Sequence, residues 1–186
     1  MTEHTDSDKT SAAKKHNKVF AKTLLTTISS IIVAAAVIIL ICSFILPVFK
    51  VTGDSMTPLL SKGDIILCNK NTEIKKGDVI AFYHNRKVLI KRVIASSNDV
   101  INLLDDGTVE LNGQKLNETY VSEKAVGQTD ITYPFTVPES RFFVMGDKRD
   151  TSVDSRSTAV GCIAEENIIG KVYLKILPLD SFGKIK

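Results

Sequence analysis

The chain has 186 residues, 44% of them apolar, and a formal net charge of +3. Residues 24–46 hold 18 apolar residues in 23 positions, which excludes a fully soluble protein, while the remainder has the composition of a folded soluble domain. After residue 46 there are 19 basic and 18 acidic residues, a balance that does not support nucleic-acid binding.

Residues 24–46 form the first predicted element, a single transmembrane helix. A helix of this length rises about 34 Å, enough for a hydrocarbon core of about 30 Å. Four lysines and no acidic residue lie within residues 14–22, so we expect the N-terminus in the cytoplasm. A cleaved signal peptide is the alternative, but bulky residues follow where a small-x-small site is needed. We expect a basic tail over residues 1–23, irregular over 1–13, and an extracytoplasmic domain over residues 47–186.

The outer domain is predicted to be mainly β. Short apolar and β-branched runs alternate with turn signals, and no helical stripe of twelve or more residues occurs after residue 46. Turns are expected at Asn85-Arg86, Asp105-Asp106-Gly107 and Asn112-Gly113. The expected strands are residues 64–68, 78–84, 87–95, 100–104, 108–111, 135–137, 142–145 and 168–176, the last interrupted at Gly170.

Three cysteines, Cys42, Cys68 and Cys162, include no CxxC pair. A Cys68–Cys162 disulfide is possible, but buried free thiols are the favoured interpretation. The three histidines are isolated from one another and from the cysteines, so no metal site is expected.

Ser55 is a candidate nucleophile. Gly53 and Asp54 precede it and Pro58 follows, so turn-forming residues lie on both sides of one hydroxyl. An ordinary loop serine is the alternative interpretation. Because eight residues separate Leu46 from Ser55, the hydroxyl lies within about 30 Å of the membrane exit. We expect a substrate that is membrane-bound or emerging from the bilayer.

Lys91 is a candidate general base. Alternation along residues 87–95 places it on the same strand face as Leu89 and Val93. Burial disfavours the ammonium form and lowers its pKa, and the neutral amine can then activate a serine hydroxyl. A strand-edge lysine that extends to water is the alternative. Arg92 is excluded as a base because guanidinium does not deprotonate.

A third stretch, residues 147–156, concentrates charge. A solvated charged loop is the alternative interpretation. However, Asp154 and Arg156 are two positions apart and can share one strand face, and the nearby Ser152 and Ser155 hydroxyls can orient a buried amine. The charged residues are Asp147, Lys148, Arg149, Asp150, Asp154 and Arg156.

Together, and in this order behind an N-terminal anchor, these stretches resemble the bacterial type I signal peptidases of the compact Gram-positive type. The matching pieces are Gly-Asp-Ser-Met-Thr-Pro at 53–58, Lys-Gly-Asp at 62–64, Ile-Lys-Arg-Val at 90–93, and residues 146–156. The resemblance implies a signal-peptidase-like β-sheet catalytic domain after one transmembrane helix. It also implies a serine endopeptidase of the cell membrane that removes signal peptides from exported preproteins, cleaving after small residues at −1 and −3.

The resemblance further implies a Ser–Lys dyad that uses no metal or cofactor. Ser55 would be the nucleophile and Lys91 the general base, with Ser152 positioning the Lys91 amine. Asp154 and Arg156 would form a supporting ion pair, with Asp147 as further scaffold. The substrate would lie extended beside the strand that carries Leu89 and Ile90. The implied substrate-binding residues are Val51, Met56, Leu60, Leu89 and Ile90.

Two positions depart from the family pattern. Some relatives carry a serine two residues before the nucleophile, and its hydroxyl helps to hold the oxyanion; here that position is Gly53. The usual Gly-Asp-Asn-Arg is Gly-Asp-Lys-Arg, with Lys148.

Two other function classes compete with this interpretation. A membrane-tethered β module without activity need not keep both Ser55 and Lys91. A self-cleaving Ser–Lys protease of the repressor type would carry a DNA-binding helical domain where the membrane segment lies. The expected partners are therefore preproteins and the lipid bilayer, not nucleic acid, and the oligomeric state is left open.

Overall fold

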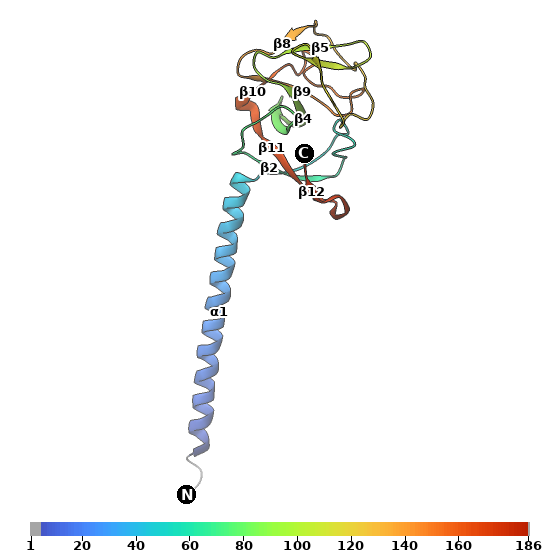
Figure 1. Ribbon diagram of the computed structural model, residues 1–186. Helices are drawn as coiled ribbons and strands as arrows, with labels where there is room; N and C mark the ends of the chain where they lie inside the picture. Colours follow the sequence, from blue (N-terminus) through green and yellow to red (C-terminus); the bar gives the residue numbers. More distant parts are fainter. Residues whose placement is uncertain (1–4, 186) are drawn as a thin grey trace. The chain divides into compact units, whose positions relative to one another are not determined.

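The computed structural model describes residues 5–185, and the chain divides into two units, one ending at Phe44 and one beginning at Ile45. A single helix, α1 (Thr5–Ile45), accounts for the described residues of the first unit and is drawn as one continuous helix in Figure 1. Its segment Phe20–Leu40 is long and apolar enough to cross a membrane by length and composition. Pro47 follows the helix and disfavours helical backbone at the residue before it, which accounts for the C-terminal end.

The start of α1 differs from the expectation of an irregular tail over residues 1–13. Residues 5–13 are helical, and residues 1–4 lie outside the described part of the chain. Neither glycine nor proline occurs before Pro47, and Ala12, Ala13, Lys14 and Lys15 all favour helix. The helix therefore continues N-terminally beyond the apolar segment.

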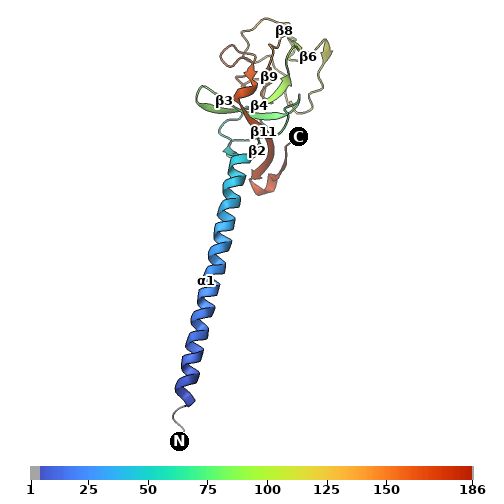
Figure 2. The same cartoon turned by 90° about the vertical axis from the view of Figure 1, so that its left-hand side faces the viewer.

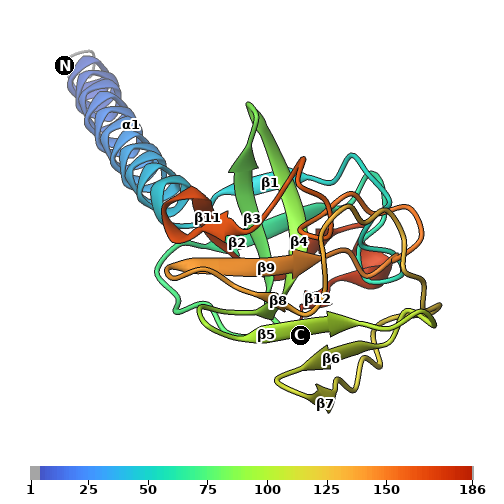
Figure 3. The same ribbon diagram turned by 90° about the horizontal axis from the view of Figure 1, so that it is seen from above.

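The second unit contains two antiparallel sheets (Figures 2 and 3). The larger has strand order β1-β2-β11-β3-β4-β9-β10, with β12 also paired to β11, and the smaller has order β7-β6-β5-β8. The strands of the larger sheet are β1 (Val48–Lys50), β2 (Ile65–Asn69), β3 (Val79–His84), β4 (Lys87–Ala95), β9 (Arg141–Met145), β10 (Ile163–Ala164), β11 (Ile168–Leu177) and β12 (Gly183–Lys184). Those of the smaller sheet are β5 (Val100–Leu103), β6 (Val109–Leu111), β7 (Gln114–Lys115) and β8 (Phe135–Thr136).

Strand β4 contributes to all three apolar clusters of this unit. Val88 and Ile90 pack against one cluster, which contains Val51 and Met56, and Leu89 and Val93 belong to another. Ile94 and Ala95 both join the third cluster, because the pairing of β4 with β9 shifts register between Val93 and Ala95. The predicted alternation is thus confirmed up to Val93 and lost at the shift.

All eight expected strands are present, and their ends differ from the expected ends by no more than a residue or so. The tight turn between β3 and β4 has positive φ at Asn85 (46°) and Arg86 (64°), as its hairpin geometry requires. The register of β11 against β3 shifts between Ile168 and Gly170, close to the predicted interruption. Strands β1, β7, β10 and β12, each two or three residues long, were not predicted. Two short 3-10 helices, Glu165–Asn167 and Leu179–Ser181, complete the unit.

Cys68 and Cys162 are both free; Cys68 is buried and Cys162 is half-buried, so the expectation of buried free thiols is confirmed for Cys68 and only in part for Cys162. Cys68 is fully buried beside Leu60 and Ile66, and burial raises the pKa of its thiol to about 12. It therefore behaves as a small core residue.

Candidate active site

Ser55 lies in the loop between β1 and β2. Backbone hydrogen bonds between Val51 and Asp64 (2.8 Å) and between Gly63 and Val51 (2.8 Å) close the base of this loop. Two of its apolar side chains, Met56 and Leu60, are 2% and 0% exposed and anchor it in the core. Ser55 is half-buried, and the loop that carries it is held by backbone hydrogen bonds at its two ends and by the buried side chains of Met56 and Leu60.

A second loop, residues 146–156, faces the Ser55 loop and follows β9. Its two ends are joined, because Ser155 N–H donates to the Val144 carbonyl (3.1 Å) and Val144 N–H donates to Ser155 Oγ (3.0 Å). Met145, the last residue of β9, pairs with Arg92 of β4. Because Arg92 directly follows Lys91, the 146–156 loop begins close to Lys91. The loops also contact each other directly, since Lys148 N–H donates to the Ser55 carbonyl (3.0 Å).

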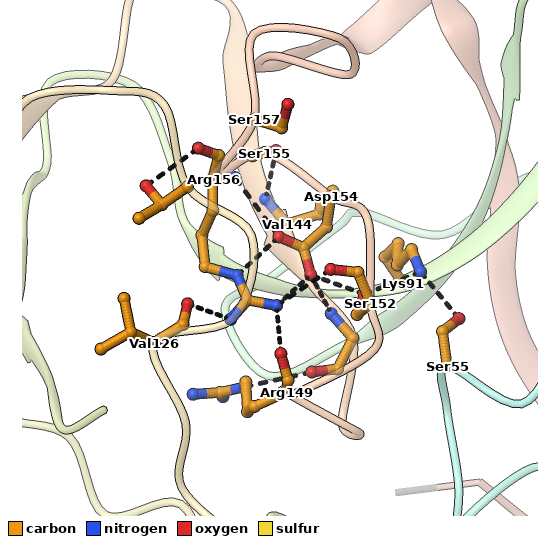
Figure 4. Close-up of polar contacts among 12 residues, drawn as sticks. Ser55, Lys91, Val126, Val144, Arg149, Ser152, Asp154, Ser155, Arg156 and Ser157 are labelled. Atoms are coloured by element: carbon orange, nitrogen blue, oxygen red, sulfur yellow. Dashed lines mark hydrogen bonds and ion pairs between the residues drawn. The ribbon is translucent and has the colours of Figure 1, made fainter. Parts of the chain in front are cut away.

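The structure brings the predicted dyad and its supporting residues together (Figure 4). Lys91 Nζ lies 2.7 Å from Ser55 Oγ and 2.9 Å from Ser152 Oγ. Ser152 Oγ lies 2.6 Å from Asp154 Oδ2. Arg156 binds the same carboxylate with Nε and Nη2, both at 2.9 Å. A continuous line of polar contacts therefore runs from Ser55 to the buried Arg156.

Lys91 is 4% exposed, and its surroundings set its protonation. Burial lowers the pKa of its ammonium group from 10.5 to about 8. The negative charge of Asp154 opposes this shift, Arg156 assists it and Asp147 opposes it. About a tenth of the amine is then neutral at pH 7, and about half at pH 8.

Asp154 is the charged partner on which Ser152 depends. Burial alone would raise the pKa of its carboxyl group, but hydrogen bonds and charge from Arg156, with hydrogen bonds from Ser152 and Gly146, hold the pKa below its usual range. Gly146 N–H donates to Asp154 Oδ2 over 2.9 Å. Asp154 is therefore a carboxylate that accepts hydrogen bonds at neutral pH.

Asp147 makes a buried ion pair with Arg92. The guanidinium binds in the side-on geometry, Nε to Oδ1 at 2.8 Å and Nη2 to Oδ2 at 2.7 Å. This pair was not predicted, because the only expectation for Arg92 was that it cannot act as a base. The ion pair of Arg149 with Glu118, a residue that no motif indicated, was not predicted either.

A small cleft of about 140 Å³ lies beside the dyad. Residues 49–53 with Ser55 and Met56 line one side of it, and residues 88–91 line the other. Of the implied substrate-binding residues, Val51, Met56, Leu89 and Ile90 line this cleft, whereas Leu60 lies in the apolar cluster that also contains Val51 and Met56. Strand β9 pairs only with Arg92, Val93 and Ala95 of β4, so within the described residues the edge of β4 beside the cleft is open.

The two departures from the family pattern lie beside Ser55. Lys148 contacts the Ser55 carbonyl through its backbone, so that contact does not depend on its side chain. A Cβ added at Gly53 would meet no atom within 4 Å. Within the described residues, no group of three or more His, Cys, Asp or Glu side chains could hold a metal ion.

Known proteins provide an independent comparison. A family model described as signal peptidase, peptidase S26, matches residues 24–177. Signal peptidase I T of Bacillus subtilis is 32% identical over 160 residues, 79% of this chain and 82% of that protein. Signal peptidase IB of Staphylococcus aureus is 32% identical over 181 residues, 87% and 93% of the two chains. A crystal structure of a signal peptidase I from Enterococcus faecalis superposes with a TM-score of 0.46 at 28% identity, covering 54% of this chain and 97% of that one.

Proposed function

Because the chain belongs to the signal peptidase family, peptidase S26, it is a serine peptidase that removes signal peptides, and we propose that Ser55 and Lys91 perform the cleavage as a dyad. Ser55 is the nucleophile, and neutral Lys91 is the general base. Ser152 and the Asp154–Arg156 pair hold the amine in position, and Asp147 supports the loop from which they come.

One observation carries this proposal, namely the direction of the hydrogen bond between Ser152 and Asp154. The Asp154 carboxylate is ionised, so over the 2.6 Å distance the Ser152 hydroxyl is the donor. Ser152 Oγ must then accept from an N–H of Lys91 at 2.9 Å. This leaves the lone pair of the neutral amine available for the Ser55 hydroxyl proton, across 2.7 Å.

The reaction follows from this arrangement. Lys91 takes the Ser55 proton as Oγ forms a bond to the carbonyl carbon of the −1 residue. The protonated Lys91 then gives its proton to the leaving amine as the peptide C–N bond breaks. Lys91 next takes a proton from water as the water oxygen forms a bond to the acyl carbonyl carbon, and gives that proton to Ser55 Oγ as the acyl–Oγ bond breaks, which releases the signal peptide. Within the described residues Ser55 N–H donates to no protein acceptor, which supports a role for it in binding the oxyanion.

The cleft supports the expected substrate class. An extended peptide can add to the open edge of β4 beside Leu89 and Ile90 and place alternate side chains in the cleft. A space of about 140 Å³ with apolar lining from Val51 and Met56 accommodates small residues, in keeping with small side chains at −1 and −3 of an exported preprotein.

The membrane arrangement is also a proposal. Residues 24–46 span the cell membrane as an uncleaved anchor, residues 1–23 stay in the cytoplasm, and residues 47–186 form the extracytoplasmic catalytic domain. The apolar segment Phe20–Leu40 and the lysines before it support this direction. Protease protection of each end in sealed vesicles tests it.

The dyad is tested by cleavage of exported precursors with the full-length chain in detergent or lipid. Ser55→Ala and Lys91→Ala should each lower the rate by about 10³-fold or more, while both proteins still fold and insert. Ser61→Ala and Lys87→Ala are matched controls, since both residues are exposed and lie near the same two elements. Wild-type cleavage by either dyad variant would contradict the proposal. N-terminal sequencing of the products tests the rule for small residues.

A further inference from the structure

Glu118 lies outside every motif, yet it forms a fully buried ion pair with Arg149 of the 146–156 loop. Both guanidinium Nη atoms contact the carboxylate, and the side chains are 1% and 0% exposed. Burying two charges costs free energy unless both are well satisfied, so such a pair is weak evidence for a stabilising role.

Arg149 connects this ion pair to the centre of the site. Its Nε donates to the Gly146 carbonyl over 3.1 Å. The other end of Gly146, its N–H, donates to Asp154 Oδ2. A Cβ at Gly146 would lie 2.6 Å from the Ser55 carbonyl oxygen and would overlap the Ser152 side chain. Any movement of Gly146 is thus transmitted to Ser55, Ser152 and Asp154.

Tyr120 connects the same carboxylate to the neighbouring ion pair. Its hydroxyl donates to Glu118 Oε1 over 2.9 Å, and its ring lies 4.0 Å from the guanidinium carbon of Arg92. Arg92 in turn binds Asp147, the residue after Gly146. Glu118 and Tyr120 therefore contact the arginines that hold Gly146 and Asp147.

The segment that carries Glu118, residues 116–130, is itself fixed at several points. Leu116 N–H donates to the Val109 carbonyl (2.9 Å), which ties it to the smaller sheet. The Val126 carbonyl accepts from Arg156 Nη1 (2.7 Å), which ties it to the site. Glu118 thus belongs to a segment held at both the smaller sheet and the catalytic loop.

We propose that Glu118 is a positioning residue for peptide cleavage: it holds Arg149, and through the Gly146 carbonyl it keeps Ser152 and Lys91 in line with Ser55. This inference rests on the proposed Ser55–Lys91 dyad. Glu118 touches neither the cleft nor the reacting atoms, so it acts on the chemical step and leaves substrate binding unchanged.

The test is the pH profile and the separate kcat and KM of Glu118→Gln, measured on the full-length chain in detergent with a precursor peptide. We expect kcat to fall about 10–100-fold, the loss given by one charge-assisted hydrogen bond, and KM to change less than about twofold. We also expect the acid limb of kcat/KM to move to higher pH, because a loosened loop admits water to Lys91. The charges around Lys91, namely Asp147, Asp154 and Arg156, are unaltered by the substitution.

Matched variants separate positioning from general stability. Glu123→Gln makes the same chemical change at an exposed position of the same segment and should leave kcat, KM and the pH profile unchanged. Glu118→Asp keeps the charge and should recover part of kcat. Tyr120→Phe removes the hydroxyl donor but keeps the ring over Arg92, and should lower kcat about threefold or more. The last two variants keep the question answerable if Glu118→Gln fails to fold.

The outcomes are distinguishable. The positioning role would be overturned if Glu118→Asp and Tyr120→Phe both keep the wild-type kcat and pH profile, and if Glu118→Gln either has normal kinetics or fails to fold. Those results would leave the dyad intact, provided Ser55→Ala and Lys91→Ala remain inactive. Active Ser55→Ala or Lys91→Ala would instead remove the dyad on which the inference depends.

Discussion

Gly146 packs against the side chain of Ser152 so closely that no Cβ fits between them. A Cβ built there would overlap the Ser152 hydroxyl and lie 2.6 Å from Ser152 Cβ. The absent side chain lets Gly146 lie against both Ser152, in its own loop, and the carbonyl of Ser55, in the facing loop, so the two loops of the site meet at a glycine.

Gly146→Ala should therefore inactivate the enzyme. The added methyl group must displace either Ser152 or the Ser55 loop, and we expect cleavage to fall by at least about 100-fold. Gly183→Ala is the matched control, since a Cβ at Gly183 meets nothing within 4 Å. Precursor cleavage is the measurement, with circular dichroism to compare the folds. Near-normal cleavage by Gly146→Ala would show that the two loops can separate without consequence.

The pH dependence of kcat/KM should report the protonation of Lys91. The base must be neutral, and burial lowers the pKa of its ammonium group to about 8. Activity should therefore rise about tenfold per pH unit below pH 8 and level off above it. A steady-state profile between pH 6 and 10 measures this. A flat profile, or a rate that still rises about tenfold per pH unit between pH 9 and 10, would be incompatible with a buried amine as the base.

The same burial should make Lys91 destabilising. Its folded pKa of about 8 lies below the ordinary value of 10.5, so between these pH values the unfolded chain binds more protons and stability rises with pH. Below pH 8 Lys91 is charged in the folded protein, so burying its ammonium group lowers the free energy of unfolding by the full amount. Lys91→Met should then be more stable at pH 7, by up to about 3 kcal/mol less the lost hydrogen bonds, and should lose the slope above pH 8. Urea unfolding in detergent, followed by circular dichroism, gives both the free energy of unfolding at pH 7 and its dependence on pH above pH 8.

Ser152→Ala should lower kcat while leaving KM nearly unchanged. The substitution removes the acceptor for the Lys91 N–H at 2.9 Å, so the amine is free to turn away from Ser55. We expect a loss of about 10–100-fold, the value of one hydrogen bond to the positive charge that Lys91 gains as it takes the Ser55 proton. Ser122→Ala, at an exposed position, is the control. A large rise in KM instead would mean that Ser152 acts on substrate binding.

Some of this site follows from the sequence and some does not. Alternation in residues 87–95 placed Lys91 among apolar neighbours because a strand of nine residues carries several periods. The i, i+2 spacing of Asp154 and Arg156 likewise indicated a local pair, and the structure contains it. Glu118 and Arg149 meet across 31 positions, and residues 116–130 have no regular period. This contact depends on how residues 116–130 pack against the 146–156 loop, and a local sequence pattern does not predict such packing.

Gly53 occupies the position at which the family pattern includes, in some members, a serine whose hydroxyl helps to hold the oxyanion. The position has free space for a side chain, and its backbone is outside the left-handed region, so a serine can be introduced without strain. An added hydroxyl donor beside Ser55 should strengthen oxyanion binding only in the transition state, which raises kcat and leaves KM unchanged. We expect an increase of about tenfold in Gly53→Ser, less than the 10²–10³ lost when a native donor is removed. Gly53→Ala adds similar bulk at the lining of the cleft without the hydroxyl, so the ratio of the two rates isolates the contribution of the hydroxyl. Equal rates in Gly53→Ser and Gly53→Ala would mean that the oxyanion lies out of reach of this position and depends on backbone N–H groups alone.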